Sequence, residues 1–211
     1  MTTKMLLRCG IADLTTCCLM ALNVAGCGIA AESFTPTPVK APLTIQEARA
    51  LLTSGSPEQR IAAALAVPTF GDDAREAVPQ LEANLFFLSS HDVRRAAAIA
   101  LGEIGQRATD AAPSLLDVLA EDPSAPVRVA TADALGRIGS RVAVPRLAEH
   151  LGDESMEVQI ACALAISRIT DVQFQDVGSD GIYTLDESGQ PLIVVQARLW
   201  WHTLGQYTEW E

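Results

Sequence analysis

The feature that most constrains this chain is an internal repeat. One segment recurs four times without gaps, as SPEQRIAAALAVPTFG, SHDVRRAAAIALGEIG, SAPVRVATADALGRIG and SMEVQIACALAISRIT. The copies begin at Ser56, Ser90, Ser124 and Ser155, so their starts are separated by 34, 34 and 31 residues. A fixed period of this length is typical of repeat proteins, in which each unit buries its apolar face against its neighbour. The body of the chain is therefore expected to be a stack of repeats with a continuous core.

A second repeated unit lies between these copies. It reads AVPQLEANL, AAPSLLDVL and AVPRLAEHL, over residues 77–85, 111–119 and 143–151. The three copies share a proline at the third position and leucines at the fifth and ninth positions. Two alternating units in each period predict two structural elements in each repeat.

Both units have the pattern of helices. In the second copy, apolar residues recur at the three- to four-residue spacing of one helix face. These residues are Val93, Ala96, Ala97, Ala100, Leu101 and Ile104. The serine that opens each copy stands where an N-cap is favoured, and Gly105 and Gly139 stand where helices commonly end. Thr44 and Glu47 have the spacing of a capping box that opens an earlier helix. The sequence predicts an all-α fold with about four helix pairs over residues 43–170.

Two of the copies share a Val-Arg pair and an Ala-Leu-Gly-x-Ile-Gly ending. The matching residues are Val93-Arg94 with 100–105, and Val127-Arg128 with 134–139. This pattern resembles the HEAT repeat, and specifically the short bacterial HEAT-like form of phycobilisome-lyase-type proteins. The resemblance implies a short α-solenoid in which the second helix of each pair lines the concave, partner-binding side. Pro68 and Gln159 depart from the pattern in the outer copies, as is usual for terminal repeats.

Residues 171–211 are expected to cap the last repeat. They hold six of the ten aromatic side chains, and large aromatics bury much apolar area where an open end must be covered. We predict a short hairpin over residues 181–195 with a turn at Glu187-Ser188-Gly189, followed by a helix over residues 196–204. The Trp200-Trp201 pair is expected to pack in this cap, and the alternative is that one of the two forms an exposed binding patch.

The beginning of the chain predicts a targeting signal followed by a tether. Basic residues precede a mostly apolar run over residues 14–26, which is the pattern of a secretory signal peptide. Val24-Ala25-Gly26-Cys27 resembles the bacterial lipobox, which implies a lipoprotein signal peptide over residues 1–26 and acylation of Cys27. Residues 27–42 would then form a Pro/Thr-rich tether. The expected location is the outer membrane or the periplasmic face in a Gram-negative bacterium, with the N-terminal lipid as the membrane anchor.

Three other interpretations of the leader stay open. Ordinary cleavage after Ala30 or Ala31 would leave a soluble periplasmic protein. Residues 11–31 would instead remain as an uncleaved anchor, although Asp13 makes this stretch of 21 residues marginal for that role. In the third interpretation, the start of the chain is wrongly assigned and the protein is cytoplasmic.

The net charge excludes one class of partner. The chain carries 15 Lys and Arg against 26 Asp and Glu, a formal net charge of -11. Nucleic acids and anionic lipid surfaces are bound through a basic footprint, which this composition lacks. No nucleic acid partner is therefore expected.

No pattern of catalytic or cofactor-binding residues is present. His91, His150 and His202 lie near three unrelated helices and have no HExxH spacing, so no metal site is expected. The acidic residues of the segment 176–187 lack EF-hand spacing and are expected to form a solvated loop. Cys162 lies among apolar residues and is expected to be a small buried hydrophobe. We expect a non-enzymatic protein without a cofactor.

Three arginines occupy one position of the repeat: Arg60, Arg94 and Arg128. Such a row would suit an anionic ligand. Arginine at this position of HEAT-like units usually pairs with a nearby carboxylate, and its guanidinium is well suited to partly buried ion pairs. We therefore expect ion pairs that tie adjacent turns together.

The repeat helices also carry side chains that lie away from the packed stripe. These are Arg95, Ile99, Glu103, Val129, Asp133, Arg137, Leu164 and Arg168. They are expected to form a mixed-charge groove that binds a protein partner. The function expected is a non-catalytic, membrane-tethered HEAT-repeat scaffold. The alternative is a cytoplasmic, phycobilisome-lyase-like chromophore lyase or chaperone subunit, a role that export would exclude.

Overall fold

The computed structural model describes residues 44–174 and 185–210 of the chain. The predicted signal peptide, Cys27 and the Pro/Thr-rich tether lie outside these residues. So do the first part of the predicted hairpin and the acidic residues Asp176 and Asp180.

Across the described residues, α-helices are joined by short turns and 3-10 segments. The α-helices are α1 (Ile45–Ser54), α2 (Pro57–Ala66), α3 (Val78–Leu85), α4 (His91–Ile104), α5 (Ala112–Glu121), α6 (Ala125–Ile138), α7 (Val144–Glu149), α8 (Met156–Thr170) and α9 (Leu192–Thr203). The 3-10 segments are η1 (Val67–Ala77), η2 (Gly105–Ala111), η3 (Arg141–Ala143), η4 (His150–Gly152) and η5 (Gly205–Tyr207). None of the helices in this part of the chain combines the length and the apolar character needed to cross a membrane.

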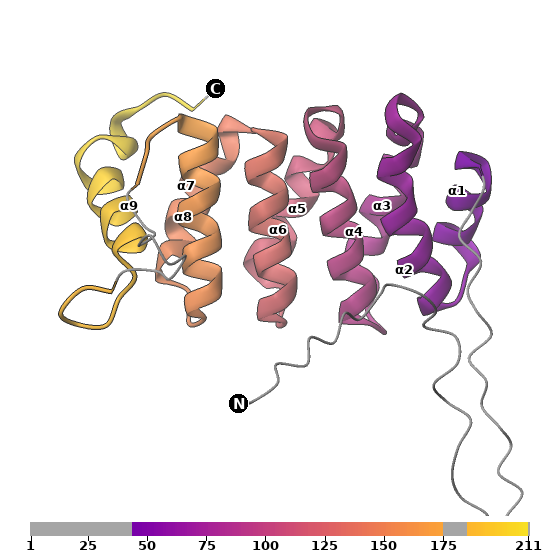
Figure 1. Cartoon of the computed structure of the whole chain (residues 1–211), viewed down its shortest axis with the longest axis horizontal. Coiled ribbons are helices and arrows are strands. Elements are labelled where there is room, and N and C mark those ends of the chain that lie inside the picture. The colour runs from indigo at the N-terminus through magenta and orange to yellow at the C-terminus, as the bar shows by residue number, and fades with distance from the viewer. Residues whose placement is uncertain (1–43, 175–184, 211) are drawn as a thin grey trace, which may run out of the picture. The chain divides into compact units, whose positions relative to one another are not determined.

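The helices are arranged as two layers of a short solenoid. α2, α4, α6 and α8 pack side by side in one layer, as Figure 1 shows. α1, α3, α5 and α7 form the other layer, and each packs against the helix that follows it. The prediction of an all-α solenoid built from four helix pairs is confirmed.

Glycines allow neighbouring helices of the first layer to approach closely. A Cβ atom on Gly102 would lie 2.9 Å from the Cα of Ala134, and one on Gly136 would lie 2.9 Å from the Cα of Ala165. These two glycines are therefore required where α4 meets α6 and where α6 meets α8. Fully buried leucines from both layers complete the core, including Leu81, Leu101, Leu115, Leu135 and Leu147.

Serine caps open two of the four repeat helices. The Ser56 hydroxyl accepts the N–H of Gln59 at 3.4 Å, and the Gln59 side chain accepts the N–H of Ser56 at 2.9 Å. The Ser90 hydroxyl accepts the N–H of Val93 at 3.4 Å. These contacts satisfy N–H groups that have no partner within the first turn. The prediction of serine N-caps is confirmed for α2 and α4.

At α6 and α8 a serine also stands at the N-cap position, as predicted, but its side chain does not cap the helix. The hydroxyls of Ser124 and Ser155 make no capping hydrogen bond. Asp122 accepts the N–H of Ser124 and Asp153 accepts the N–H of Ser155, both at 2.8 Å. At the start of these two helices, an aspartate two residues before the serine forms the turn by accepting the N–H of the serine. The first two copies have no acidic residue at that position.

α9 covers the end of the array by packing against α7 and α8 (Figure 1). It begins at Leu192, so the prediction of strand structure up to residue 195 is wrong. Ile193 and Val194 are fully buried, and this packing overrides the strand preference of β-branched residues. The predicted turn is present, because Gly189 has a φ of 82° and one antiparallel bridge joins Leu185 to Pro191.

The tryptophans of the cap form one aromatic cluster. The ring centroid of Trp200 lies 6.0 Å from those of Phe174 and Trp210, and 6.4 Å from that of Trp201. A Cβ atom on Gly205 would lie 2.6 Å from a ring carbon of Trp201, so a glycine is required beneath the rings. Both members of the Trp200-Trp201 pair pack within this cluster.

Candidate protein-binding groove

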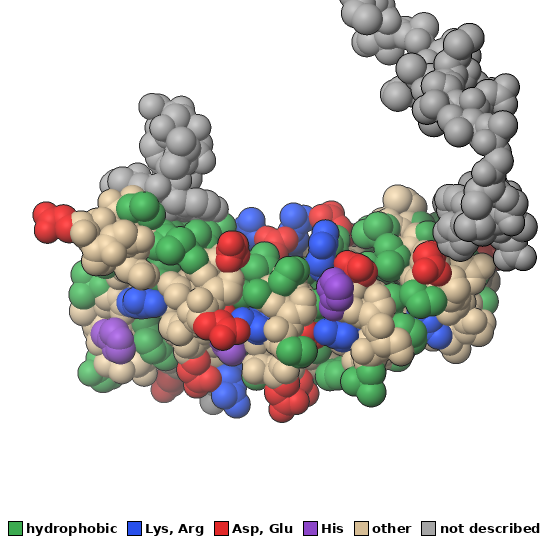
Figure 2. Space-filling model, turned by 90° about the horizontal axis from the view of Figure 1, so that it is seen from below, with side chains coloured by type: hydrophobic (Ala, Val, Ile, Leu, Met, Phe, Trp, Pro, Cys, Tyr) green, Lys and Arg blue, Asp and Glu red, His purple; other side chains and the backbone are tan. Residues whose placement is uncertain are grey.

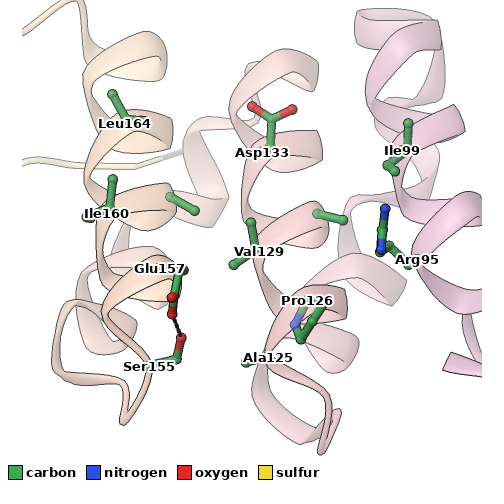
Figure 3. A pocket seen from close by; sticks show the side chains of 12 residues that line it. Arg95, Ile99, Ala125, Pro126, Val129, Asp133, Ser155, Glu157, Ile160 and Leu164 are labelled. Carbon is green, nitrogen blue, oxygen red and sulfur yellow. Dashed lines mark hydrogen bonds between the residues drawn. The ribbon is translucent and has the colours of Figure 1, made fainter. Parts of the chain in front are cut away.

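An apolar groove of about 820 Å³ is lined by α4, α6 and α8. The middle helix, α6, contributes the small side chains of Ala125, Val129 and Ala130 to its floor. The flanking helices carry larger side chains, among them Ile99 on α4 and Leu164 on α8 (Figure 3). The hollow is therefore built from side chains of three successive repeats.

Five of the eight side chains that the sequence predicts for a partner-binding surface line this groove. They are Arg95, Ile99, Val129, Asp133 and Leu164. Glu103, Arg137 and Arg168 do not line it. The structure thus brings together the apolar members of the predicted set and separates most of the charged ones.

Four of the five charged members, Glu103, Asp133, Arg137 and Arg168, form a row of ion pairs along the same three helices. Arg137 donates to Glu103 and to Asp133, with nitrogen–oxygen distances of 2.7 Å in both cases. Arg168 donates to the other carboxylate oxygen of Asp133. Burial alone would raise the pKa of Asp133, but the hydrogen bonds from Arg168 and Arg137 lower it below its usual value. These charges are therefore satisfied within the chain.

The apolar side chains of the groove stay partly open to solvent. Ile99, Val129, Ile160 and Leu164 are half-buried and pack against the core on one side. Contiguous apolar surface of this kind in a soluble domain commonly marks an interaction site. The groove is therefore the candidate site for a binding partner.

Two charged side chains flank the apolar floor on opposite sides of α6. Arg95 of α4 is exposed and makes no ion pair, hydrogen bond or ring contact within the described residues. Glu157 of α8 accepts the hydroxyl hydrogen of Ser155 at 2.5 Å, and this bond lowers the pKa of Glu157. Glu157 forms no ion pair with the described residues.

Part of the lining lies outside the set of residues predicted from the sequence. The missed side chains include Ala125, Pro126, Ala130, Glu157, Ile160 and Ala161. The repeat alignment carries the signal for Ile160, which stands at the same repeat position as Arg95 and Val129.

Two of the three aligned arginines form the predicted ion pairs. Arg94 donates to both carboxylate oxygens of Asp122 at 2.6 and 3.0 Å. Arg128 donates to both oxygens of Asp153 at 3.0 and 2.8 Å. Each arginine of one repeat helix thus holds the turn that precedes the next repeat helix.

Arg60 does not follow this pattern, so the prediction of a carboxylate partner is wrong for it. Arg60 donates to Oδ1 of Asn84 at 2.8 Å and to carbonyl oxygens at the end of α1 and in the turn after it. It also lies over the ring of Phe87, 4.9 Å from the centroid. Leu88 occupies the repeat position of Asp122 and Asp153, so no carboxylate is available there.

Other titratable groups lie apart from the groove. Cys162 is fully buried, and burial raises the pKa of its thiol. His91 and His150 each lie near an aspartate of their own segment, and His202 is exposed at the end of α9. Within residues 44–174 and 185–210, His, Cys, Asp and Glu side chains form no group of three or more that could hold a metal ion.

The sequence pattern of HEAT repeats matches residues 45–128 and 112–177. The chain belongs to the HEAT repeat family. The groove therefore lies on the second helices of successive HEAT pairs. The face of the array seen in Figure 2 carries acidic and basic side chains interspersed among apolar ones, with no gathering of basic residues.

Two solved structures are similar to this HEAT-repeat chain. One is the complex of CpcE and CpcF of phycocyanin lyase from Nostoc sp. PCC7120, at 21% identity and a TM-score of 0.48, over 61% of this chain and 79% of that chain. The other is an engineered protein, at 21% identity and a TM-score of 0.50, over 74% of this chain and 66% of that chain. A search of curated proteins found no match. At this identity, the likeness to the engineered protein shows the fold alone.

Proposed function

We propose that this HEAT-repeat chain is a non-catalytic scaffold that binds a segment of another protein in the groove between α4 and α8. The observation that carries the proposal is the groove itself, in which Ile99, Val129, Ile160 and Leu164 present apolar surface to solvent. Covering such surface with an apolar partner segment is favourable by about 25 cal/mol for each Å² buried. Repeat arrays commonly bind protein partners on extended surfaces of this kind.

The charges of the chain favour a protein over a nucleic acid as this partner. The net charge is -11, and Arg137 and Arg168 beside the groove are engaged by Glu103 and Asp133. Phosphate backbones are bound through available basic side chains. An apolar floor with paired charges beside it suits an apolar protein segment.

The state of two ionisable groups, Asp133 in the groove and Cys162 in the core, supports a role without catalysis. Asp133 is held as a carboxylate by two arginines, and the thiol of Cys162 is buried in the core. A general base or a nucleophile needs access to a substrate and a pKa suited to its task. Neither Asp133 nor Cys162 meets both conditions.

Photo-cross-linking in the cell tests the groove as the binding site. A photoreactive amino acid at Leu164 is expected to give a discrete cross-linked species in the native host. Val129→Trp should reduce that species about tenfold, because an indole fills the floor of the groove. The matched control is Val142→Trp, because Val142 is exposed on η3 and does not line the groove.

Two results would contradict this function. One is cross-linking of equal strength from a photoreactive group at Val142. The other is an unchanged cross-link in Val129→Trp when circular dichroism shows that the variant keeps its helical content. Either result would separate the groove from partner binding.

We further propose that the chain is exported and anchored by a lipid on Cys27, at the outer membrane or the periplasmic face of a Gram-negative bacterium. The lipobox-like sequence ending at Cys27 supports this location. The mass of the N-terminal peptide in fractionated cells tests it. An acylated peptide beginning at Cys27 in the membrane fraction is expected, and Cys27→Ser should abolish the acylation. An unmodified N-terminus at Met1 or Met5 in the soluble fraction would favour the cytoplasmic alternative, a chromophore lyase or chaperone subunit.

A further inference from the structure

The groove carries two charges that no ion pair of the described residues neutralises. Arg95 lies on the α4 side and Glu157 on the α8 side, with the apolar floor of α6 between them (Figure 3). Asp133, the third charged side chain of the lining, is already paired with Arg137 and Arg168. The groove is therefore basic at one end and acidic at the other.

Arg95 is unusual among the arginines that the structure describes. Each of the other arginines within residues 44–174 and 185–210 makes an ion pair, a hydrogen bond or a cation–π contact. In a chain with 26 acidic residues, an exposed guanidinium beside apolar side chains has been left without a carboxylate. Such a group is available to a carboxylate from outside the chain.

We propose that the bound segment is apolar at its centre, with an acidic residue at the end that faces Arg95 and a basic residue at the end that faces Glu157. This inference rests on the proposed function, because it describes the partner of the same groove. An apolar segment alone would remove water from both charges without replacing their hydrogen bonds, which is unfavourable. A segment with charges of the opposite sign at its two ends pairs with both.

The arrangement also fixes how the segment lies in the groove. Opposite charges at the two ends attract one orientation and repel the reversed one, because the reversed segment would bring like charges together. Arg95 and Glu157 are therefore expected to set specificity and orientation, and the apolar floor is expected to supply most of the affinity.

Selection from a random peptide library tests this chemistry. The probe is a displayed library of peptides of about twelve residues, long enough to span several side-chain positions. The bait is the full chain. A counter-selection with the Val129→Trp variant, whose groove is filled, removes peptides that bind outside the groove. The expected result is a consensus with an apolar centre and one acidic and one basic flank.

A charge exchange on one selected peptide then tests each end. Arg95→Glu should weaken binding of that peptide about tenfold, and replacing its acidic residue by lysine should restore binding to the variant. Glu157→Arg should behave in the same way towards the basic residue of the peptide. Arg141→Glu is the matched control, because Arg141 lies over the ring of Trp210 outside the groove, and it should leave the affinity unchanged.

The outcomes separate this inference from the function on which it rests. One outcome is a set of apolar peptides that lose affinity for Val129→Trp but bind Arg95→Glu and Glu157→Arg with unchanged affinity. This outcome would overturn the inference but would still support the proposed function. A selection that yields no peptide sensitive to Val129→Trp would overturn both. Rescue of each variant by the peptide of exchanged charge supports both.

Discussion

Arg128 of α6 holds Asp153, in the turn before α8, through both carboxylate oxygens. The distances are 3.0 Å from Nε and 2.8 Å from Nη2, and only 8% of the arginine side chain and 7% of the aspartate side chain are exposed. Asp153 also accepts the N–H of Ser155 at 2.8 Å. One carboxylate therefore joins the third repeat helix to the start of the fourth.

Removing one partner of this pair is expected to destabilise the array. Asp153→Ala leaves the guanidinium of Arg128 buried without its main partner, so the free energy of unfolding should fall by about 3 kcal/mol or more. The matched control is Asp133→Ala, whose side chain is 38% exposed and should cost about 1 kcal/mol or less. Denaturant unfolding followed by circular dichroism measures both, and equal losses would contradict the role given to burial.

The same pair predicts a dependence of stability on pH. Burial alone would raise the pKa of Asp153, but the hydrogen bonds from Arg128 and from the N–H of Ser155 lower it below its usual value. The unfolded chain, with an aspartate pKa of about 3.9, therefore binds more protons than the folded chain in the interval between the two pKa values. The free energy of unfolding should stay level near neutral pH, begin to fall at about pH 5 and decrease further as pH drops through the folded pKa.

Thermal unfolding at a series of pH values measures this dependence. Asp153→Asn should flatten the acid limb relative to the native chain, because an amide does not titrate. The idea fails if the slope between about pH 5 and 3 is the same in both proteins.

At Gly102 and Gly136, substitution by alanine is expected to have the opposite of its usual effect on stability. An alanine in place of an exposed helical glycine stabilises a helix by up to about 1 kcal/mol. Gly102→Ala and Gly136→Ala should instead destabilise by about 1–3 kcal/mol, because the added carbon meets the backbone of the neighbouring helix. Gly152→Ala is the control, because a Cβ there has no neighbour within 4 Å. Melting temperatures measure the three variants, and a stabilised Gly102→Ala would contradict the close approach of α4 and α6.

The thiol of Cys162 is expected to be unreactive in the folded chain. It is fully buried, and burial raises its pKa, so little thiolate forms at neutral pH. After treatment with an alkylating reagent, mass spectrometry of the peptide containing Cys162 should show modification only when denaturant is present. The control is the alkylation of a model thiol under the native conditions. Rapid modification of the native chain would contradict the packing of α8.

Much of the fold follows from local patterns that the sequence displays. The spacing of alanine and leucine specifies one face of each repeat helix, and a proline early in each intervening helix fits the first turn. Gly105 and Gly139 adopt the positive φ values, 66° and 76°, that end α4 and α6. Such features depend on residues within a few positions of one another, so they can be predicted without the structure.

The start of α9 and the partner of Arg60 depend on contacts that no local pattern contains. Ile193 and Val194 suit a strand by residue type, yet they form a helix because α8 offers them an apolar surface. Arg60 is aligned with Arg94 and Arg128, but a distant residue, Leu88, stands at the repeat position where those two arginines find an aspartate. Both differences arise from residues that are far apart along the chain.

The same distinction applies to the groove. Periodicity specifies which face of each repeat helix is buried, so repeated helices with an exposed set of side chains follow from the sequence. That Ile99, Val129 and Leu164 share one hollow while Arg137 pairs with Glu103 follows only from the packed fold. A hollow and an ion pair both depend on the sizes and charges of side chains from different helices, and only packing brings those side chains within contact distance.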